Sequence, residues 1–175
     1  MRKCVRVYAF AALLAFAVVA LPFSARAQQA PRELQPPATE HALLQVHAKG
    51  DQIYTCSMDG GKYSWTLKAP EANLFDKDGK PFGKHFAGPS WKANDGSQVT
   101  GKAAANAPSP DANSIPWLLV TVVNRSGKGI LARVTSIQRL NTIGGKAPAS
   151  GCDAANAGSE LRVPYSADYV FFAPQ

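Results

Sequence analysis

The chain has 175 residues, a formal net charge of +7, and 46% hydrophobic and 18% charged residues. This composition is that of a folded protein, and the length fits one domain with a sizeable core. Basic residues are scattered beyond residue 27, where no two are adjacent. The sequence therefore argues against a nucleic-acid-binding surface, which usually clusters them.

The first 27 residues have the pattern of a secretory signal peptide. Arg2, Lys3 and Arg6 precede an apolar run over residues 7–23, and small residues stand at Ala25 and Ala27. The run is short for a membrane span and contains a proline. We expect cleavage after Ala27, export to the periplasm or the cell exterior, and no membrane span afterwards. Removal of residues 1–27 leaves 15 basic and 12 acidic residues, a charge of +3 on 148 residues.

Residues 28–40 predict an extended tether, because three prolines and few apolar residues occur there. The folded domain is expected over residues 41–175. It begins with two strands, residues 42–47 and 51–58, joined by a turn at Lys49-Gly50-Asp51. Side chains alternate along a strand, so Tyr54, Cys56 and Met58 are expected on the core face together with Gln52.

Turn signals then recur along the chain. Asp59-Gly60-Gly61 predicts a hairpin, and Asp-Gly pairs at residues 78–79 and 95–96 predict further turns. The segments between the turns favour strands, and one helical turn at most is expected over residues 153–158. The expected strands are residues 62–68, 74–75, 80–87, 98–104, 115–123, 130–140 and 169–172. About ten short, mainly antiparallel strands indicate an all-β sandwich or barrel.

Two cysteines remain after removal of the leader, because Cys4 leaves with it. An even pair in an exported chain predicts a disulfide between Cys56 and Cys152. Such a bond would tie the second strand to the end of a loop expected over residues 141–151, which Cys152 directly follows. The alternative is a metal-binding or redox-active pair, but the sequence has no Cys-x-x-Cys motif that would favour it.

The motifs H-x-x-G-P-x-W-x-x-x-D-G-S, from His85, and I-Q-R-x-N-T-x-G-G, from Ile137, occur together. In this combination the chain resembles an exported family of bacteria and fungi known as domain of unknown function 3455, over about residues 40–173. The resemblance implies export and a single domain, and it brings no activity, ligand or catalytic residue. Some relatives carry dehydrogenase names, but this chain has neither a G-x-G-x-x-G motif nor a βαβ pattern.

The stretch from Gly83 to Gly101 holds three candidate site residues. Asp95 could reach His85 across a hairpin and orient its imidazole. Trp91 could form the floor of a pocket, although such a tryptophan also suits a core. The alternative is a purely structural role, in which Asp95 only begins a turn and His85 is a hydrogen-bonded residue of the fold.

A second polar cluster follows a strand: Gln138, Arg139, Asn141 and Thr142. Arg139 could clamp a carboxylate through two hydrogen bonds. The alternative is that these groups hold the Gly144-Gly145 loop. We expect the cluster to converge with His85, Trp91 and Asp95 around one concavity, as polar groups do in small-ligand sites.

The leading functional hypothesis is a non-catalytic module that binds a small molecule or an envelope component, without a cofactor, metal or nucleic acid. The alternative is a hydrolase-type enzyme using His85, for which Ser90, Ser97 and Asp95 supply the other residue types. A metal or redox carrier is the third hypothesis, because His47, Cys56 and Met58 together resemble a copper ligand set. The sequence identifies neither a ligand nor an oligomeric state.

Overall fold

The computed structural model describes residues 30–175. The expected signal peptide, its cleavage site and the first two residues of the expected tether lie outside this range. Antiparallel strands make up most of the described chain, with three short 3₁₀ turns. The strands are β1 (Glu40–Asp59), β2 (Lys62–Phe75), β3 (Pro81–Phe86), β4 (Ser90–Ala93), β5 (Gln98–Ala107), β6 (Trp117–Ser126), β7 (Ser136–Gly144) and β8 (Glu160–Pro174).

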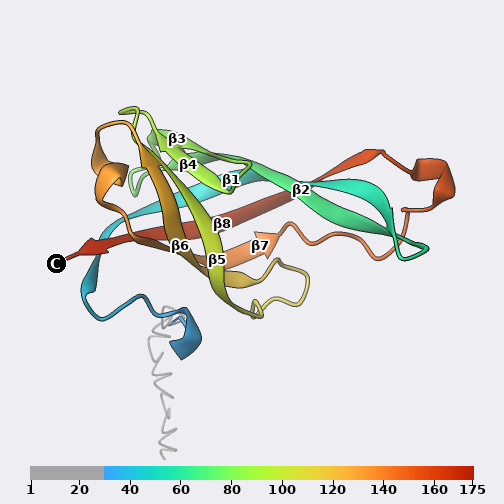
Figure 1. The fold of residues 1–175 in the computed structure, drawn as a ribbon, viewed down its shortest axis with the longest axis horizontal. Coiled ribbons are helices and arrows are strands. Elements are labelled where there is room, and N and C mark those ends of the chain that lie inside the picture. Colours follow the sequence, from blue (N-terminus) through green and yellow to red (C-terminus); the bar gives the residue numbers. More distant parts are fainter. Residues whose placement is uncertain (1–29) are drawn as a thin grey trace, which may run out of the picture.

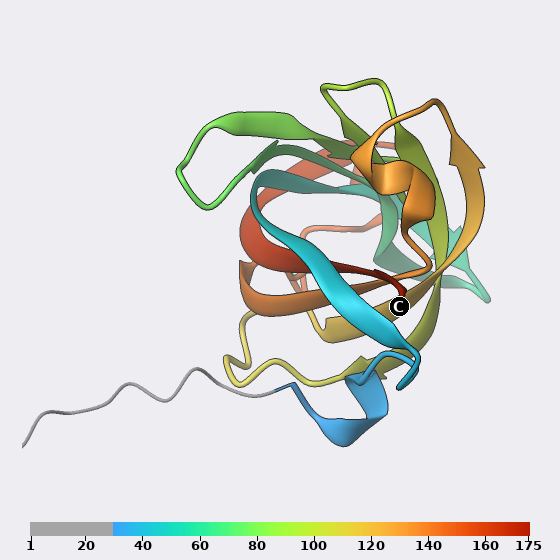
Figure 2. The ribbon, with the colours of Figure 1, turned by 90° about the vertical axis from the view of Figure 1, so that its left-hand side faces the viewer.

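The eight strands form one closed barrel in sequence order. Each strand pairs with the next, and β8 closes the ring by pairing with β1 from Glu40↔Pro174 to Thr55↔Glu160. The ring is visible when the molecule is viewed from one end (Figure 2). The all-β prediction is therefore confirmed as a barrel, with eight strands rather than about ten because β1 and β2 each join two of the expected strands.

One side of the barrel extends into an arm. β2 pairs with β1 over its whole length but with β3 only from Ala72 onward, so residues 62–71 have no second neighbouring strand in the described chain. Figure 1 shows β1 and β2 running out from the barrel together with the first part of β8. β3 therefore pairs only with the last residues of β2, from Ala72 to Phe75, where β2 joins the barrel.

The core fills the barrel interior because apolar residues alternate along each strand. In β8, Tyr165, Ala167, Tyr169 and Phe171 are buried, and Ser166 and Asp168 between them are more accessible. Small residues such as Ala48, Ala72 and Ala167 also face this core. Ala48 and Ala167 are paired directly across β1 and β8.

The disulfide between Cys56 and Cys152 is present, with its Cα atoms 5.3 Å apart. Cys56 lies in the part of β1 that enters the arm, and its backbone also bonds residues 158 and 159. The disulfide therefore fastens the loop before β8 to the arm.

The expected turn at Lys49-Gly50-Asp51 is wrong, because β1 continues through it. A Cβ atom on Gly50 would lie 2.1 Å from the carbonyl oxygen of Glu71. This glycine therefore permits close approach of two backbones rather than a change of direction. The expected core position of Met58 is also wrong, since its side chain is 62% exposed at the tip of the arm.

The expected strand over residues 130–140 is half wrong. Residues Ile130–Arg133 form a 3₁₀ turn, η2, and β7 begins at Ser136 and runs to Gly144 into the expected loop. The Asp95 carboxylate accepts from the Ile130 backbone N–H, and the Ser97 hydroxyl accepts from that of Leu131. Side chains from the distant β4–β5 turn thus hold η2, which local propensity could not reveal. The single helical turn expected over residues 153–158 is present as η3 (Ala154–Asn156).

The expected tether does not lie wholly outside the core. Residues Arg32–Leu34 form a 3₁₀ turn, η1, and the Leu34 side chain is fully buried with Ala107 and Trp117. The Gln138 side chain also donates to the Leu34 carbonyl oxygen at 2.6 Å. In Figure 2, η1 lies against the outside of the ring. Within residues 30–175, no helix is long and apolar enough to cross a membrane.

Candidate functional site

A cavity of about 470 Å³ opens where β2 leaves the barrel wall. Every strand contributes a residue to its lining, which places the cavity at the mouth of the barrel. The polar and aromatic lining residues are Gln52 of β1, Lys68 of β2, His85 of β3, Trp91 of β4, Arg139 of β7 and Tyr169 of β8. The apolar lining includes Leu67, Pro89, Ala103, Leu118 and Val120. Barrel mouths are common sites for small ligands.

The cavity floor is aromatic and buried. The His85 and Trp91 rings stack with their centroids 4.4 Å apart and an interplanar angle of 13°. Tyr169 packs edge-on against both rings. All three side chains are at most 2% exposed. The register explains the stack, because His85 and Trp91 are directly paired across β3 and β4.

His85 is neutral in this environment. Burial is the largest cause that lowers its pKa to about 3; the hydrogen bond to Ser90 opposes this shift, and the charge of Arg139 adds to it. Nδ1 lies 2.9 Å from the Ser90 carbonyl oxygen. A carbonyl oxygen only accepts, so Nδ1 carries the proton and Nε2 keeps a free lone pair. His85 therefore offers an acceptor rather than a positive charge.

Several buried polar atoms around the floor lack a hydrogen-bond partner within residues 30–175: Gln52 Nε2, Trp91 Nε1, Tyr165 Oη and Tyr169 Oη. The two tyrosine hydroxyls affect each other's pKa, Gln52 affects that of Tyr165 and Arg139 that of Tyr169, so these groups lie near one another. Their geometry nevertheless does not complete a hydrogen bond to Gln52 Nε2, Tyr165 Oη or Tyr169 Oη. Burial is the main cause that raises the pKa of both tyrosines, so both hydroxyls keep their protons at neutral pH. Unpartnered buried polar groups are rare and costly, and they often mark functional sites.

Arg139 brings a positive charge to the cavity. Its Nε and Nη2 atoms donate to the Pro116 carbonyl oxygen at 3.1 and 2.8 Å. A guanidinium group has five N–H donors, so others remain for further contacts. The charge of Arg139 also limits the rise in the pKa of Tyr165 and Tyr169. Arg139 is thus fixed by the loop before β6 and stays within electrostatic reach of the floor.

The expected pairing of Asp95 with His85 does not occur. The Asp95 carboxylate accepts from the Ser97 backbone N–H, the Ser97 hydroxyl and the Ile130 N–H. These bonds, led by that from the Ser97 hydroxyl, lower the pKa of Asp95. The Ser90 hydroxyl bonds Thr100, and Ser97 is occupied by Asp95 and Leu131. The residues proposed for a hydrolase are thus not assembled around His85.

The second polar cluster is divided between two faces of β7. Arg139 reaches the barrel cavity, whereas its neighbour Gln138 points to the outer face and bonds Leu34. Asn141 donates to Asp168, and the Thr142 hydroxyl donates to the Ile115 carbonyl oxygen. Of the seven candidate residues, the structure therefore brings together His85, Trp91 and Arg139. Asp95, Gln138, Asn141 and Thr142 have structural contacts elsewhere.

Sequence reasoning missed Gln52 and Tyr169 as site residues. Gln52 was expected on the core face of its strand, and a glutamine among buried aromatic residues was the available signal. Tyr169 stood in an apolar run that only indicated a final strand. Neither residue belongs to a motif that points to a ligand.

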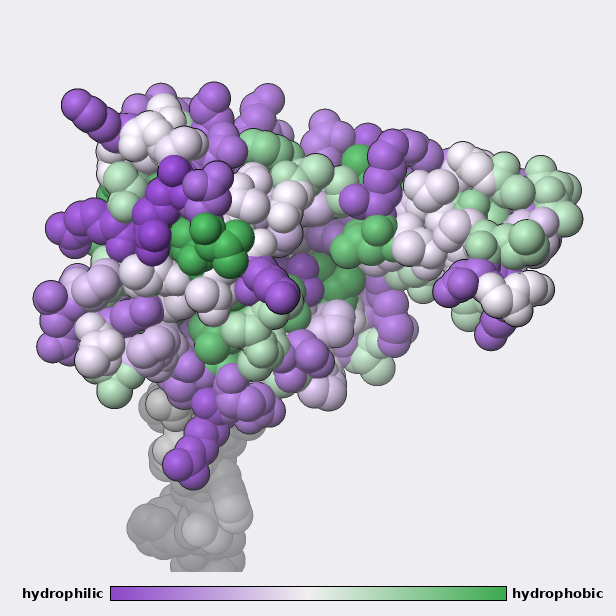
Figure 3. All heavy atoms as spheres, viewed as in Figure 1, coloured by the Kyte–Doolittle hydropathy of each residue, from purple (hydrophilic) through white to green (hydrophobic). Residues whose placement is uncertain are grey.

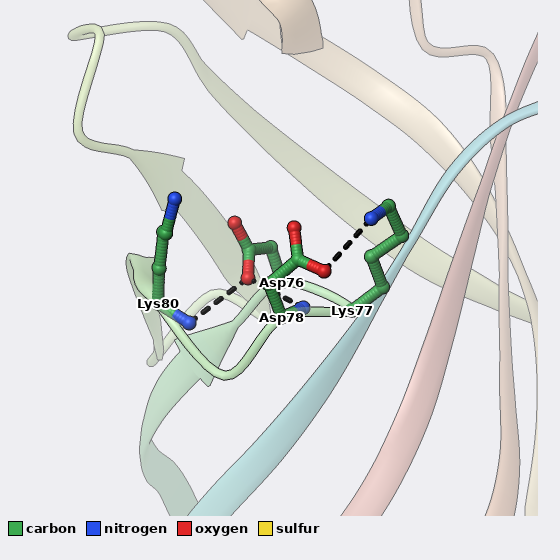
Figure 4. Close-up of polar contacts among 4 residues, drawn as sticks. All are labelled: Asp76, Lys77, Asp78 and Lys80. Carbon is green, nitrogen blue, oxygen red and sulfur yellow. Dashed lines mark hydrogen bonds and ion pairs between the residues drawn. The ribbon is translucent and has the colours of Figure 1, made fainter.

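A larger cavity, about 740 Å³, lies beside the β2–β3 turn. The charged side chains that line it already have partners. Asp76 accepts from the backbone N–H groups of Asp78 and Lys80, and Lys77 pairs with Asp78 (Figure 4). His47 pairs with Asp168 at 2.9 Å. This cavity is larger, but its charged groups already have partners, so we favour the barrel cavity as the candidate site.

No group of three or more His, Cys, Asp or Glu side chains within residues 30–175 is placed to hold a metal ion. The hypothetical copper set is not formed, because Cys56 is in the disulfide and Met58 is exposed at the arm tip.

A family model described as "Protein of unknown function (DUF3455)" matches residues 37–173. The match covers nearly all of the described chain, including every strand of the barrel. No curated protein and no solved structure matches the chain.

Proposed function

The chain belongs to the DUF3455 family, and we propose that its barrel is a non-catalytic module that binds a small organic molecule in the cavity at its mouth. One observation carries this proposal: buried polar groups that have no partner among residues 30–175 surround a cavity to which all eight strands contribute. Its volume lies in the range of small-molecule sites. Aromatic and aliphatic walls with a few polar groups are the usual composition of such sites.

The face of the molecule shown in Figure 3 favours a small ligand over a macromolecular partner. On the face shown in Figure 3, hydrophobic residues occur in small groups among hydrophilic ones. A stable protein interface usually requires a larger continuous patch.

We also propose that the module acts outside the cytoplasm. The pattern of residues 1–27 and the Cys56–Cys152 disulfide support this location, because disulfides persist in oxidising compartments. Cell fractionation of the full chain tests the point. Recovery of the uncleaved chain with the cytoplasm would overturn it.

A cavity-filling variant tests ligand binding. Ala103 is exposed and lines the cavity, so Ala103→Trp should obstruct the mouth. Ala104, its exposed neighbour, does not line the cavity, and Ala104→Trp is the matched control. A thermal-shift and calorimetric screen of small aromatic and aliphatic compounds on the purified protein should give binders that Ala103→Trp loses and Ala104→Trp keeps. No binder at all, or equal binding by both variants, would overturn the proposal.

A further inference from the structure

The polar groups around the barrel cavity are mainly hydrogen-bond donors. Gln52 Nε2 and Trp91 Nε1 can only donate, and the Arg139 guanidinium has no acceptor. The Tyr169 hydroxyl can donate or accept. Among the described residues that line the cavity there is no aspartate or glutamate. His85 Nε2 is an acceptor in the same lining, but a ligand that completes the bonds of the donors must present acceptor atoms.

The charges around the cavity also favour a ligand with acceptor atoms, in particular a negatively charged one. Lys68 at the rim is already paired with Glu160, and His85 is neutral. Arg139 is therefore the charge that a ligand would meet. The groups that shift the pKa values of His85 and Tyr169 include Arg139 but no carboxylate. A negative charge entering the cavity would be attracted by Arg139, and the carboxylate at the rim, that of Glu160, is paired with Lys68.

The remaining walls are apolar. Leu118 and Val120 of β6, together with Pro89 and Leu67, line the same cavity. Contact with these side chains favours a hydrophobic body on the ligand. A cavity of about 470 Å³ lies in the lower part of the range for small-molecule sites, which favours a compact molecule.

From this arrangement we propose that the ligand is a small organic anion, a carboxylate joined to a compact apolar body. The carboxylate accepts from Arg139 and the floor donors, and the apolar body lies against the β6 wall. This inference rests on the proposed function and specifies the ligand class for the same site.

The test compares ligands of one shape with and without the charge. Isothermal titration of the purified protein with benzoate and benzamide, and with cyclohexanecarboxylate and its amide, isolates the carboxylate. The carboxylates should bind at least about tenfold more tightly than the amides, as expected for hydrogen bonds to a charged group. Raising the salt concentration should weaken the carboxylates more than the amides.

Arg139→Gln should reduce carboxylate affinity by about tenfold or more and change amide affinity little. Arg139→Lys keeps the charge and should retain part of the preference. The matched control is Arg125→Gln. Arg125 also donates through Nε to a backbone carbonyl oxygen, that of Val134, but does not line the cavity. The Arg125→Gln substitution should therefore leave the carboxylate and amide affinities unchanged. Circular dichroism establishes that each variant folds.

The outcomes separate this inference from the function that it specifies. If amides bind as tightly as carboxylates in the wild-type protein and Ala103→Trp removes both, the cavity binds ligands but the anion inference is wrong. If the wild-type protein binds none of the screened compounds, both proposals fail. If Arg139→Gln fails to fold, the comparison of carboxylate with amide binding by the wild-type protein decides the anion inference alone.

Discussion

Acidification from pH 7 to pH 5 should destabilise the protein through His85. The imidazole is buried and its pKa in the folded state is about 3, whereas an unfolded histidine titrates near 6.5. Because the folded pKa is depressed, the unfolded state binds the proton first as the pH falls. The contribution of neutral His85 to the free energy of unfolding is therefore complete above about pH 6.5 and is lost progressively as the pH falls toward 3.

The linkage relation gives the size of the effect. Between pH 7 and pH 5 the unfolded histidine becomes almost fully protonated while the folded one stays neutral. The free energy of unfolding should then fall by about 2 kcal/mol. Glu71, Asp95 and Asp111 also have lowered pKa values, but unfolded carboxyl groups titrate near 4, so these groups act mainly below this window.

Urea unfolding at several pH values measures the effect. His85→Gln is the control, because its amide can still donate to the Ser90 carbonyl oxygen but does not titrate. The wild-type protein should lose about 2 kcal/mol more than this variant between pH 7 and pH 5. Equal pH dependence in the two proteins would refute the reasoning, as would a wild-type stability that does not change over this range.

Three further predictions concern the scaffold. Replacing Cys56 and Cys152 with alanine should cost about 4 to 5 kcal/mol in urea unfolding, because their bond closes a loop with a sequence separation of 96; a cost below about 1 kcal/mol, or free thiols in the native protein, would contradict this role. Leu34→Ala should cost at least about 2 kcal/mol because the side chain is fully buried, and unchanged thermal stability would mean that residues 28–40 are only a tether. Asp95→Ala should cost about 1 kcal/mol through lost hydrogen bonds to Ser97 and η2, while ligand affinity measured by calorimetry stays the same; a lost affinity would return Asp95 to the site.

Short-range patterns were sufficient for the fold class and for the turns at the Asp-Gly pairs, though not at Gly50. The Asp59-Gly60-Gly61 hairpin and the Asp-Gly turns lie where the sequence predicts them, because φ values at these positions depend on local residues. Alternating side chains were enough to place Tyr54 and Cys56 in the core. The cysteine count was enough to predict the disulfide, since only two cysteines lie beyond residue 27.

Distant contacts decided the remaining features. Gly50 stands inside a strand because another backbone approaches it, and η2 forms because Asp95 and Ser97 bind its first N–H groups. Leu34 is buried only because the outer face of the closed barrel offers a place for it.

The candidate site was also predicted in part from local sequence and decided in part by distant contacts. Residue chemistry was enough to select His85, Trp91 and Arg139, but it could not separate them from Asp95 and Gln138. Barrel closure turns Arg139 toward the cavity and Gln138 toward η1, since adjacent residues of a strand point to opposite faces. It also brings Gln52 and Tyr169 from opposite ends of the chain to one floor. Such a site depends on strand register, which is fixed by the whole sheet and not by any local stretch of sequence.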